Sequence, residues 1–151
     1  MSRFLPIAVG TIAFLVTGCA TGAGGPGAHF RVLAHGARSD VHKRRFVVIR
    51  DRENFAAWWR RTGATRAPPP AVDFSHRMVV ALFIGERRTG GYRIDVSGVS
   101  RSDDVATVHV REQAPGTNCR TTQALTQPFA VVSMDKVHTV RFDIRRVEKP
   151  C

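Results

Sequence analysis

Metal ligands and catalytic nucleophiles or bases in proteins are often cysteine or histidine side chains. This chain has three cysteines and six histidines. The histidines are His29, His35, His42, His76, His109 and His138. They are scattered without the pairing typical of a metal site, and no Cys-x-x-Cys motif occurs. No Gly-x-Ser-x-Gly nucleophile motif occurs either, and a Ser/His/Asp triad is recognised only by geometry. We therefore expect no metal, no cofactor, no small-molecule substrate and no enzymatic activity.

A glycine-rich segment near the middle of the chain is the next candidate. Thr89-Gly90-Gly91 is not a phosphate-binding loop, because it lacks the Gly-Lys-Ser/Thr ending and a predicted strand follows it. The glycine pair can take positive φ angles, which predicts a tight hairpin turn. The segment is either a turn that only glycines fit or a rigid loop displayed to a protein partner. The candidate partner-binding loop comprises Glu86, Arg87, Arg88, Thr89, Gly90, Gly91 and Tyr92.

The N-terminus has the pattern of an export signal. Arg3 precedes the apolar run Phe4–Val16, which is shorter than the roughly 20 residues of a membrane-spanning helix. Val16-Thr17-Gly18-Cys19 then resembles the bacterial lipoprotein box, whose cysteine is lipidated and becomes the new N-terminus. The resemblance implies lipidation of Cys19, and Ala20 after it implies sorting to the outer membrane. Ordinary secretion is the alternative.

These observations divide the chain into three parts. Residues 1–18 are the expected lipoprotein signal peptide, residues 19–29 a glycine-rich tether, and residues 30–151 a single domain. One domain fits the length, because domains hold about 100–200 residues. We expect a lipid-anchored protein of the cell envelope, on the periplasmic face of the outer membrane.

Two cysteines remain once Cys19 is lipidated. In an oxidising envelope, Cys119 and Cys151 predict one disulfide that holds the C-terminal end. A reactive or intermolecular thiol is the alternative.

The composition favours β-structure, because the chain has 19 valines and only five leucines and strands prefer β-branched residues. Short apolar or alternating runs predict about six or seven strands, at 46–49, 78–84, 92–96, 106–111, 129–134 and 140–145, with 30–33 as a possible further strand. One short helix is predicted at Arg52–Thr62, with Asp51 as its N-cap and Gly63 as its stop. Phe55 and Trp59 should face the sheet, with Trp58 at the margin. The fold class is therefore mainly β (α+β), an antiparallel two-layer sandwich or roll with one amphipathic helix.

The chain is strongly basic, with a net charge of +11 and 20 arginines. Nucleic-acid binding is disfavoured by the export signal and by aromatic residues placed as core. The run His42-Lys43-Arg44-Arg45 and the pair Arg60-Arg61 suggest an alternative function, a basic envelope-binding module for anionic lipid, lipopolysaccharide or peptidoglycan. Solvated strand faces are the plainer explanation.

A stretch of ten residues carries a family resemblance: Gly85-Glu86-Arg87-Arg88-Thr89-Gly90-Gly91-Tyr92-Arg93-Ile94. Supporting pieces are Phe55–Trp59, Val72–Ser75 and Thr126–Phe129. In this order, over Val47 to Val147, the chain resembles the C-terminal domain of the protease-complex subunit PrcB, which is common in bacterial lipoproteins. The resemblance implies a non-catalytic domain that associates with, and stabilises, an envelope serine protease. A restraining role toward such a protease is the other possibility for the same partner.

Overall fold

The computed structural model describes residues 27–63 and 67–151. The predicted signal peptide, Cys19 and most of the tether therefore lie outside the described residues. The described residues form seven strands and one helix, which agrees with the predicted six or seven strands and one short helix. They are β1 (Phe30–Gly36), β2 (Arg45–Ile49), α1 (Arg52–Trp59), β3 (Arg77–Phe83), β4 (Arg93–Ser102), β5 (Val105–Pro115), β6 (Phe129–Asp135) and β7 (Thr139–Lys149).

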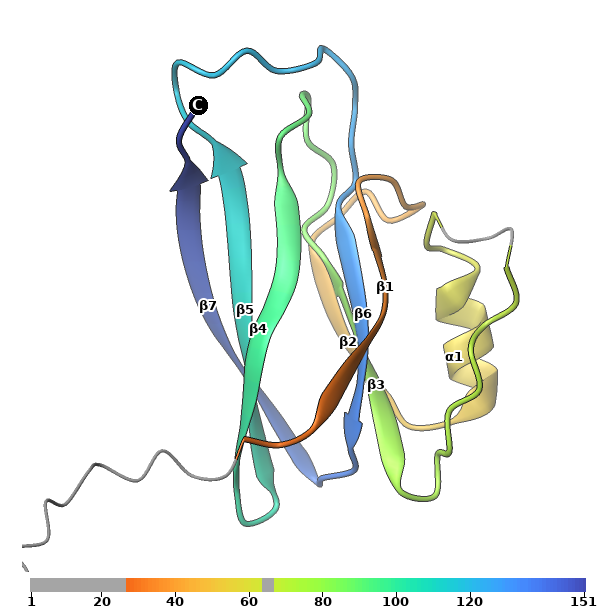
Figure 1. The fold of residues 1–151 in the computed structure, drawn as a ribbon. Helices are drawn as coiled ribbons and strands as arrows, with labels where there is room; N and C mark the ends of the chain where they lie inside the picture. The colour runs from red at the N-terminus through yellow and green to blue at the C-terminus, as the bar shows by residue number, and fades with distance from the viewer. Residues whose placement is uncertain (1–26, 64–66) are drawn as a thin grey trace, which may run out of the picture.

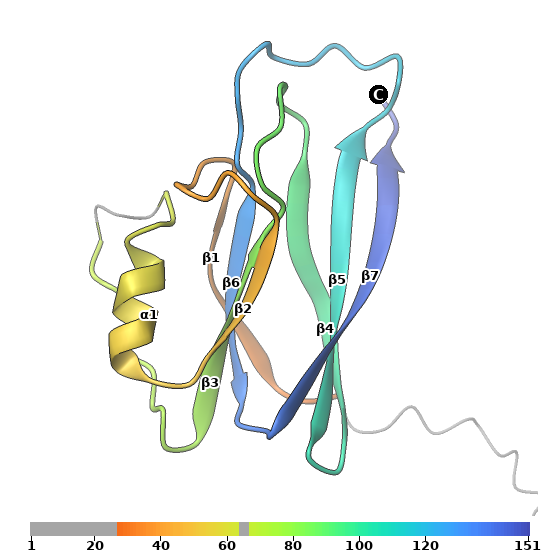
Figure 2. The same cartoon turned by 180° about the vertical axis from the view of Figure 1, so that it is seen from behind.

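The strands form two sheets that lie face to face, which confirms the predicted two-layer β fold (Figure 1). One sheet has the order β1-β6-β3-β2 and the other the order β4-β5-β7. Helix α1 covers the outer face of the four-stranded sheet, as the view from behind also shows (Figure 2). The outer face of the three-stranded sheet bears no helix among the described residues.

One pairing departs from the antiparallel prediction. Strands β5 and β7 are parallel, in register from Val105↔Thr139 to Pro115↔Lys149. Parallel neighbours need a long crossover, and here the crossover includes β6. The chain leaves β5, runs the length of the other sheet as β6, and returns as β7 in the direction of β5. An alternating sequence pattern does not show whether two strands are parallel or antiparallel, because successive side chains point to opposite faces in both cases.

The core fills the space between the sheets. Val80 and Leu82 of β3 face Val108 and Val110 of β5, and all four side chains are at most 1% exposed. The alternate residues of β3 point to the opposite face, where α1 covers them. Strand β3 is thus buried on both faces, which explains its continuous apolar sequence.

Helix α1 begins as predicted, because the Asp51 side chain accepts a hydrogen bond from the Asn54 backbone N–H at 2.9 Å. Phe55 and Trp59 are buried and Trp58 is half-buried, which confirms the predicted apolar face.

The helix ends at Trp59, three residues before the predicted Thr62. Arg61 and Thr62 bond to carbonyls three residues back, each at 3.0 Å, so the chain tightens into a turn. Gly63 does not end the helix through a positive φ. A Cβ there would collide with the Arg38 carbonyl oxygen, so close packing requires the glycine.

Candidate partner-binding site

The predicted binding loop lies in residues 84–92, which we call the crossover loop. It joins β3 to β4, and these strands belong to different sheets. The prediction that Gly90-Gly91 forms a tight hairpin is therefore wrong. Gly91 does have a positive φ of 88°, and Gly85 has one of 79°. Both positions favour glycine, because other residues adopt these angles at a cost of about 1–2 kcal/mol.

A second segment, residues 116–128, holds the crossover loop in place, and we call it the strap. Arg87 and Thr126 exchange backbone hydrogen bonds of 2.8 and 2.9 Å. The Gly90 N–H donates to the Thr122 carbonyl oxygen at 3.0 Å. A Cβ at Gly90 would collide with the Thr122 hydroxyl oxygen, so the Thr122 side chain would have to turn away to admit a larger residue. The loop is thus a fixed surface feature, although its shape is not that of a hairpin.

The strap is itself tied to the end of β7. A disulfide joins Cys119 to Cys151, as predicted, and the Gly116 N–H donates to the Lys149 carbonyl oxygen at 3.0 Å. Two cysteines paired in this way are not free thiols. The crossover loop, the strap and the end of β7 therefore form one connected surface at this end of the molecule (Figures 1 and 2).

Some side chains of the crossover loop form contacts within the domain, and others are exposed to solvent. The Glu86 carboxylate lies 2.8 Å from His42 Nδ1 and accepts from Gln127 at 3.2 Å. Its hydrogen bond with His42 holds the pKa of Glu86 below its usual value, with Gln127 adding to the effect. The Arg87 guanidinium lies 5.6 Å from the centre of the Tyr92 ring. Arg88 is exposed, so the loop presents cations to solvent.

Leu125 of the strap is a surface residue that the sequence reasoning missed. Its side chain is 56% exposed, beside Thr126, which bonds to the crossover loop. Only three leucines follow the predicted signal peptide, and one of them inside a polar loop was a usable signal. The strap thus exposes one large apolar side chain beside the segment that bonds to the crossover loop.

Glu112 of β5 is the second residue that was missed. It is 8% exposed and points to the core face, continuing the alternation of Val108 and Val110. Its carboxylate contacts Arg44 Nη2 at 2.5 Å and Arg146 Nε at 3.4 Å. A buried carboxylate requires such partners, so these two arginines serve the fold.

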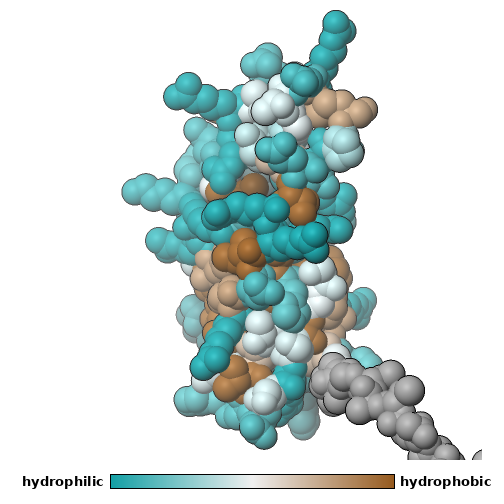
Figure 3. Space-filling model, turned by 90° about the vertical axis from the view of Figure 1, so that its left-hand side faces the viewer, coloured by the Kyte–Doolittle hydropathy of each residue, from teal (hydrophilic) through white to brown (hydrophobic). Residues whose placement is uncertain are grey.

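Most side chains of the basic run His42–Arg45 contact other residues of the domain. The Arg44 guanidinium also lies over the Phe46 ring, 4.8 Å from its centre, and Arg45 lies 6.0 Å from the Trp58 ring. Figure 3 shows the β7 side of the molecule, where apolar surface is crossed by polar side chains. Arginines of this domain therefore cover apolar edges as well as carrying charge.

A cavity of about 370 Å³ opens beside the crossover loop. It lies between the crossover loop and the C-terminal parts of β5 and β7. Ile84, Arg87 and Tyr92 line it from the loop, and Glu112 and Arg146 from the sheet. Two residues of the predicted binding loop thus share a cavity with the buried charge cluster.

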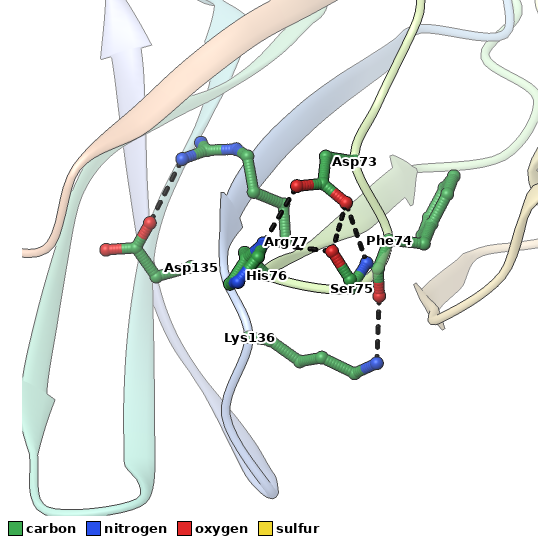
Figure 4. A network of polar contacts seen from close by, with 7 residues as sticks. All are labelled: Asp73, Phe74, Ser75, His76, Arg77, Asp135 and Lys136. Atoms are coloured by element: carbon green, nitrogen blue, oxygen red, sulfur yellow. Dashed lines mark hydrogen bonds and ion pairs between the residues drawn. The ribbon is translucent and has the colours of Figure 1, made fainter.

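A Ser/His/Asp cluster occurs elsewhere, before β3, but its geometry is that of a turn. Ser75 Oγ bonds to Asp73 Oδ1 and lies 2.9 Å from His76 Nδ1, while Asp73 Oδ2 lies 2.8 Å from the same nitrogen (Figure 4). A proton relay needs the serine and the aspartate on opposite ring nitrogens. Here both face Nδ1, so the cluster stabilises the turn into β3.

The same turn makes a testable prediction about pH. Hydrogen bonds from Ser75 and then His76 lower the pKa of Asp73 from its ordinary 3.8 to about 2. The stabilisation is present above about pH 3.8 and is lost as the pH falls through about 2. We expect Ser75→Ala to move the Asp73 midpoint toward 3.8 in a carboxyl NMR titration, and Ser97→Ala to leave it unchanged. An unshifted midpoint in Ser75→Ala would contradict the assignment.

In residues 27–63 and 67–151, no group of three or more His, Cys, Asp or Glu side chains is placed to hold a metal ion. Within the same ranges, no helix is long and apolar enough to cross a membrane.

A family comparison matches residues 78–135 to the family described as PrcB C-terminal. The match runs from β3 to β6 and includes both the crossover loop and the strap. Comparisons with curated proteins and with solved structures give no match. The resemblance to the PrcB C-terminal family that the sequence predicted is confirmed over residues 78–135.

Proposed function

We propose that this chain is a lipid-anchored protein of the cell envelope whose domain binds a protein partner without catalysing a reaction. The observation that carries the proposal is the PrcB C-terminal match over residues 78–135, since the family's name is that of a protease-complex subunit. The partner is then an envelope protease that the domain stabilises or restrains. The anchor is the lipidated Cys19, at the periplasmic face of the outer membrane.

Features of the structure support a protein partner. The crossover loop is held by backbone bonds to the strap, and a preorganised loop loses little entropy on binding. Arg88 and Leu125 supply an exposed cation and an exposed apolar side chain on the same surface.

The alternative, an envelope-binding module for anionic lipid or polymer, is favoured by the net charge of +11. The structure argues against this alternative, because two residues of the basic run are already paired: His42 with Glu86 and Arg44 with Glu112. Charges engaged in this way attract an anionic surface less than free ones.

A pull-down from envelope extract separates the two functions. We expect a protein partner to be recovered in high salt, and Tyr92→Ala or Thr89→Ala to lose it. Arg141→Ala, on the outer face of β7, is the matched control and should retain it. Recovery that is lost in high salt and unaffected by Tyr92→Ala would favour the envelope-binding module instead.

Mass spectrometry of the mature protein tests the anchor. We expect an N-terminus at Cys19 with the added mass of acyl chains. An intact Met1 without acyl mass would overturn the envelope location.

A further inference from the structure

The cavity beside the crossover loop has a distinctive arrangement of charges. Glu112 is buried and already neutralised by Arg44 and Arg146, so a cationic ligand would gain nothing from it. Arg87 differs. Its guanidinium donates to the Glu86 carbonyl oxygen at 3.0 Å and stacks on Tyr92, but no carboxylate of the described residues forms an ion pair with it.

The surroundings of the cavity favour an anion. Arg88 and Arg120 add exposed cations from the crossover loop and the strap. Glu86 of the same loop is occupied by His42 and Gln127, so it is not available to Arg87. The lining carries two arginines, Arg87 and Arg146, and two carboxylates, Glu112 and the exposed Glu148. Of the two arginines, Arg87 is the one without a carboxylate partner among the described residues.

The walls of the cavity suit a side chain better than a large headgroup. Ile84 and Tyr92 contribute an apolar and an aromatic side chain to its lining. The stack of Arg87 on Tyr92 orients the guanidinium, and an oriented guanidinium binds carboxylates with a fork of two hydrogen bonds. A volume of about 370 Å³ accommodates an acidic side chain with its flanking backbone.

We propose that this cavity receives an aspartate or glutamate side chain of the protein partner, whose carboxylate pairs with Arg87 against the wall formed by Tyr92. The inference rests on the proposed function, because it names the chemistry by which the partner is recognised at the same surface. Arg146 pairs with the ionised Glu112 carboxylate, so these two charges cancel, and the exposed Glu148 is the other carboxylate of the lining.

The cavity chemistry can be tested without the partner. The probe is the peptide acetyl-Ala-Glu-Ala-amide, compared with acetyl-Ala-Gln-Ala-amide and with phosphatidylglycerol vesicles, by NMR on the labelled domain. We expect the glutamate peptide to shift signals of residues 84–92 and the glutamine peptide not to. Arg87→Ala should abolish the shifts, Arg87→Lys should weaken them, and Arg141→Ala should preserve them. Equal shifts from both peptides, or binding of vesicles alone, would overturn the inference.

The captured partner supplies the second arm. With thermal unfolding used to verify that each variant folds, Arg87→Ala should weaken capture by about tenfold or more, and Arg141→Ala by less than about twofold. Normal capture by Arg87→Ala contradicts the inference while leaving the proposed function standing. Absence of any partner for the unmodified chain, together with binding of the glutamate peptide, contradicts the proposed function alone.

Discussion

Phe83→Ala should lower the free energy of unfolding by about 3–5 kcal/mol. Phe83 is 0% exposed and is the last residue of β3. Its ring centre lies 5.7 Å from that of Trp58 in α1 and 6.3 Å from that of Phe129 in β6. The side chain thus joins the helix to the sheet, immediately before the crossover loop, and its removal leaves a cavity that rigid neighbours cannot fill.

Urea unfolding measures this effect directly. Phe83→Leu keeps most of the volume and should cost less than about 1.5 kcal/mol. Val32→Ala, at an apolar residue of β1 that is 49% exposed, should cost less than about 0.5 kcal/mol. A loss below about 1 kcal/mol for Phe83→Ala would show that α1 does not pack on the sheet through this ring.

Breaking the disulfide is expected to have the second large effect. Cys119 and Cys151 are separated by 32 residues, and a closed loop of this length stabilises by about 3–4 kcal/mol in the chain-entropy model. The double variant Cys119→Ala/Cys151→Ala should lose that stability relative to the oxidised protein. Because the disulfide ties down the strap, the Gly90 amide, which bonds to Thr122, should also exchange faster with solvent.

Two measurements check the disulfide. Unfolding of the oxidised protein should need more urea than unfolding of the double variant, and reduction should abolish the difference. Intact mass should show the loss of two hydrogens in the oxidised protein. Equal stability of the oxidised protein and the double variant would contradict the role assigned to the disulfide.

The sequence predicted the elements well because their signals are local. The alternation of Val108 and Val110 marks β5, and Asp51 marks the start of α1. Six strands, a possible seventh at residues 30–33, and the buried Phe55 and Trp59 follow from such patterns. The parallel pairing of β5 with β7 does not, because it depends on which sheet each strand joins.

The candidate site was only partly predictable, for a similar reason. Glycines at 90 and 91 marked the crossover loop, but its route between sheets and the strap that holds it are long-range features. Glu112 carried a local signal, a charge on the apolar face of a predicted strand. It was missed because the predicted strand ended at residue 111, four residues before its observed end at Pro115.

The claim that the crossover loop and the strap bind a protein is tested most directly by site-specific photocrosslinking in the envelope. A photoreactive residue would replace Arg88 or Leu125, which are exposed on this surface, and Thr107, on the outer face of β5, would be the control position. We predict one protein adduct from both positions 88 and 125, resistant to high salt, and none from position 107. Adducts of equal yield from position 107, or none from positions 88 and 125, would contradict the claim.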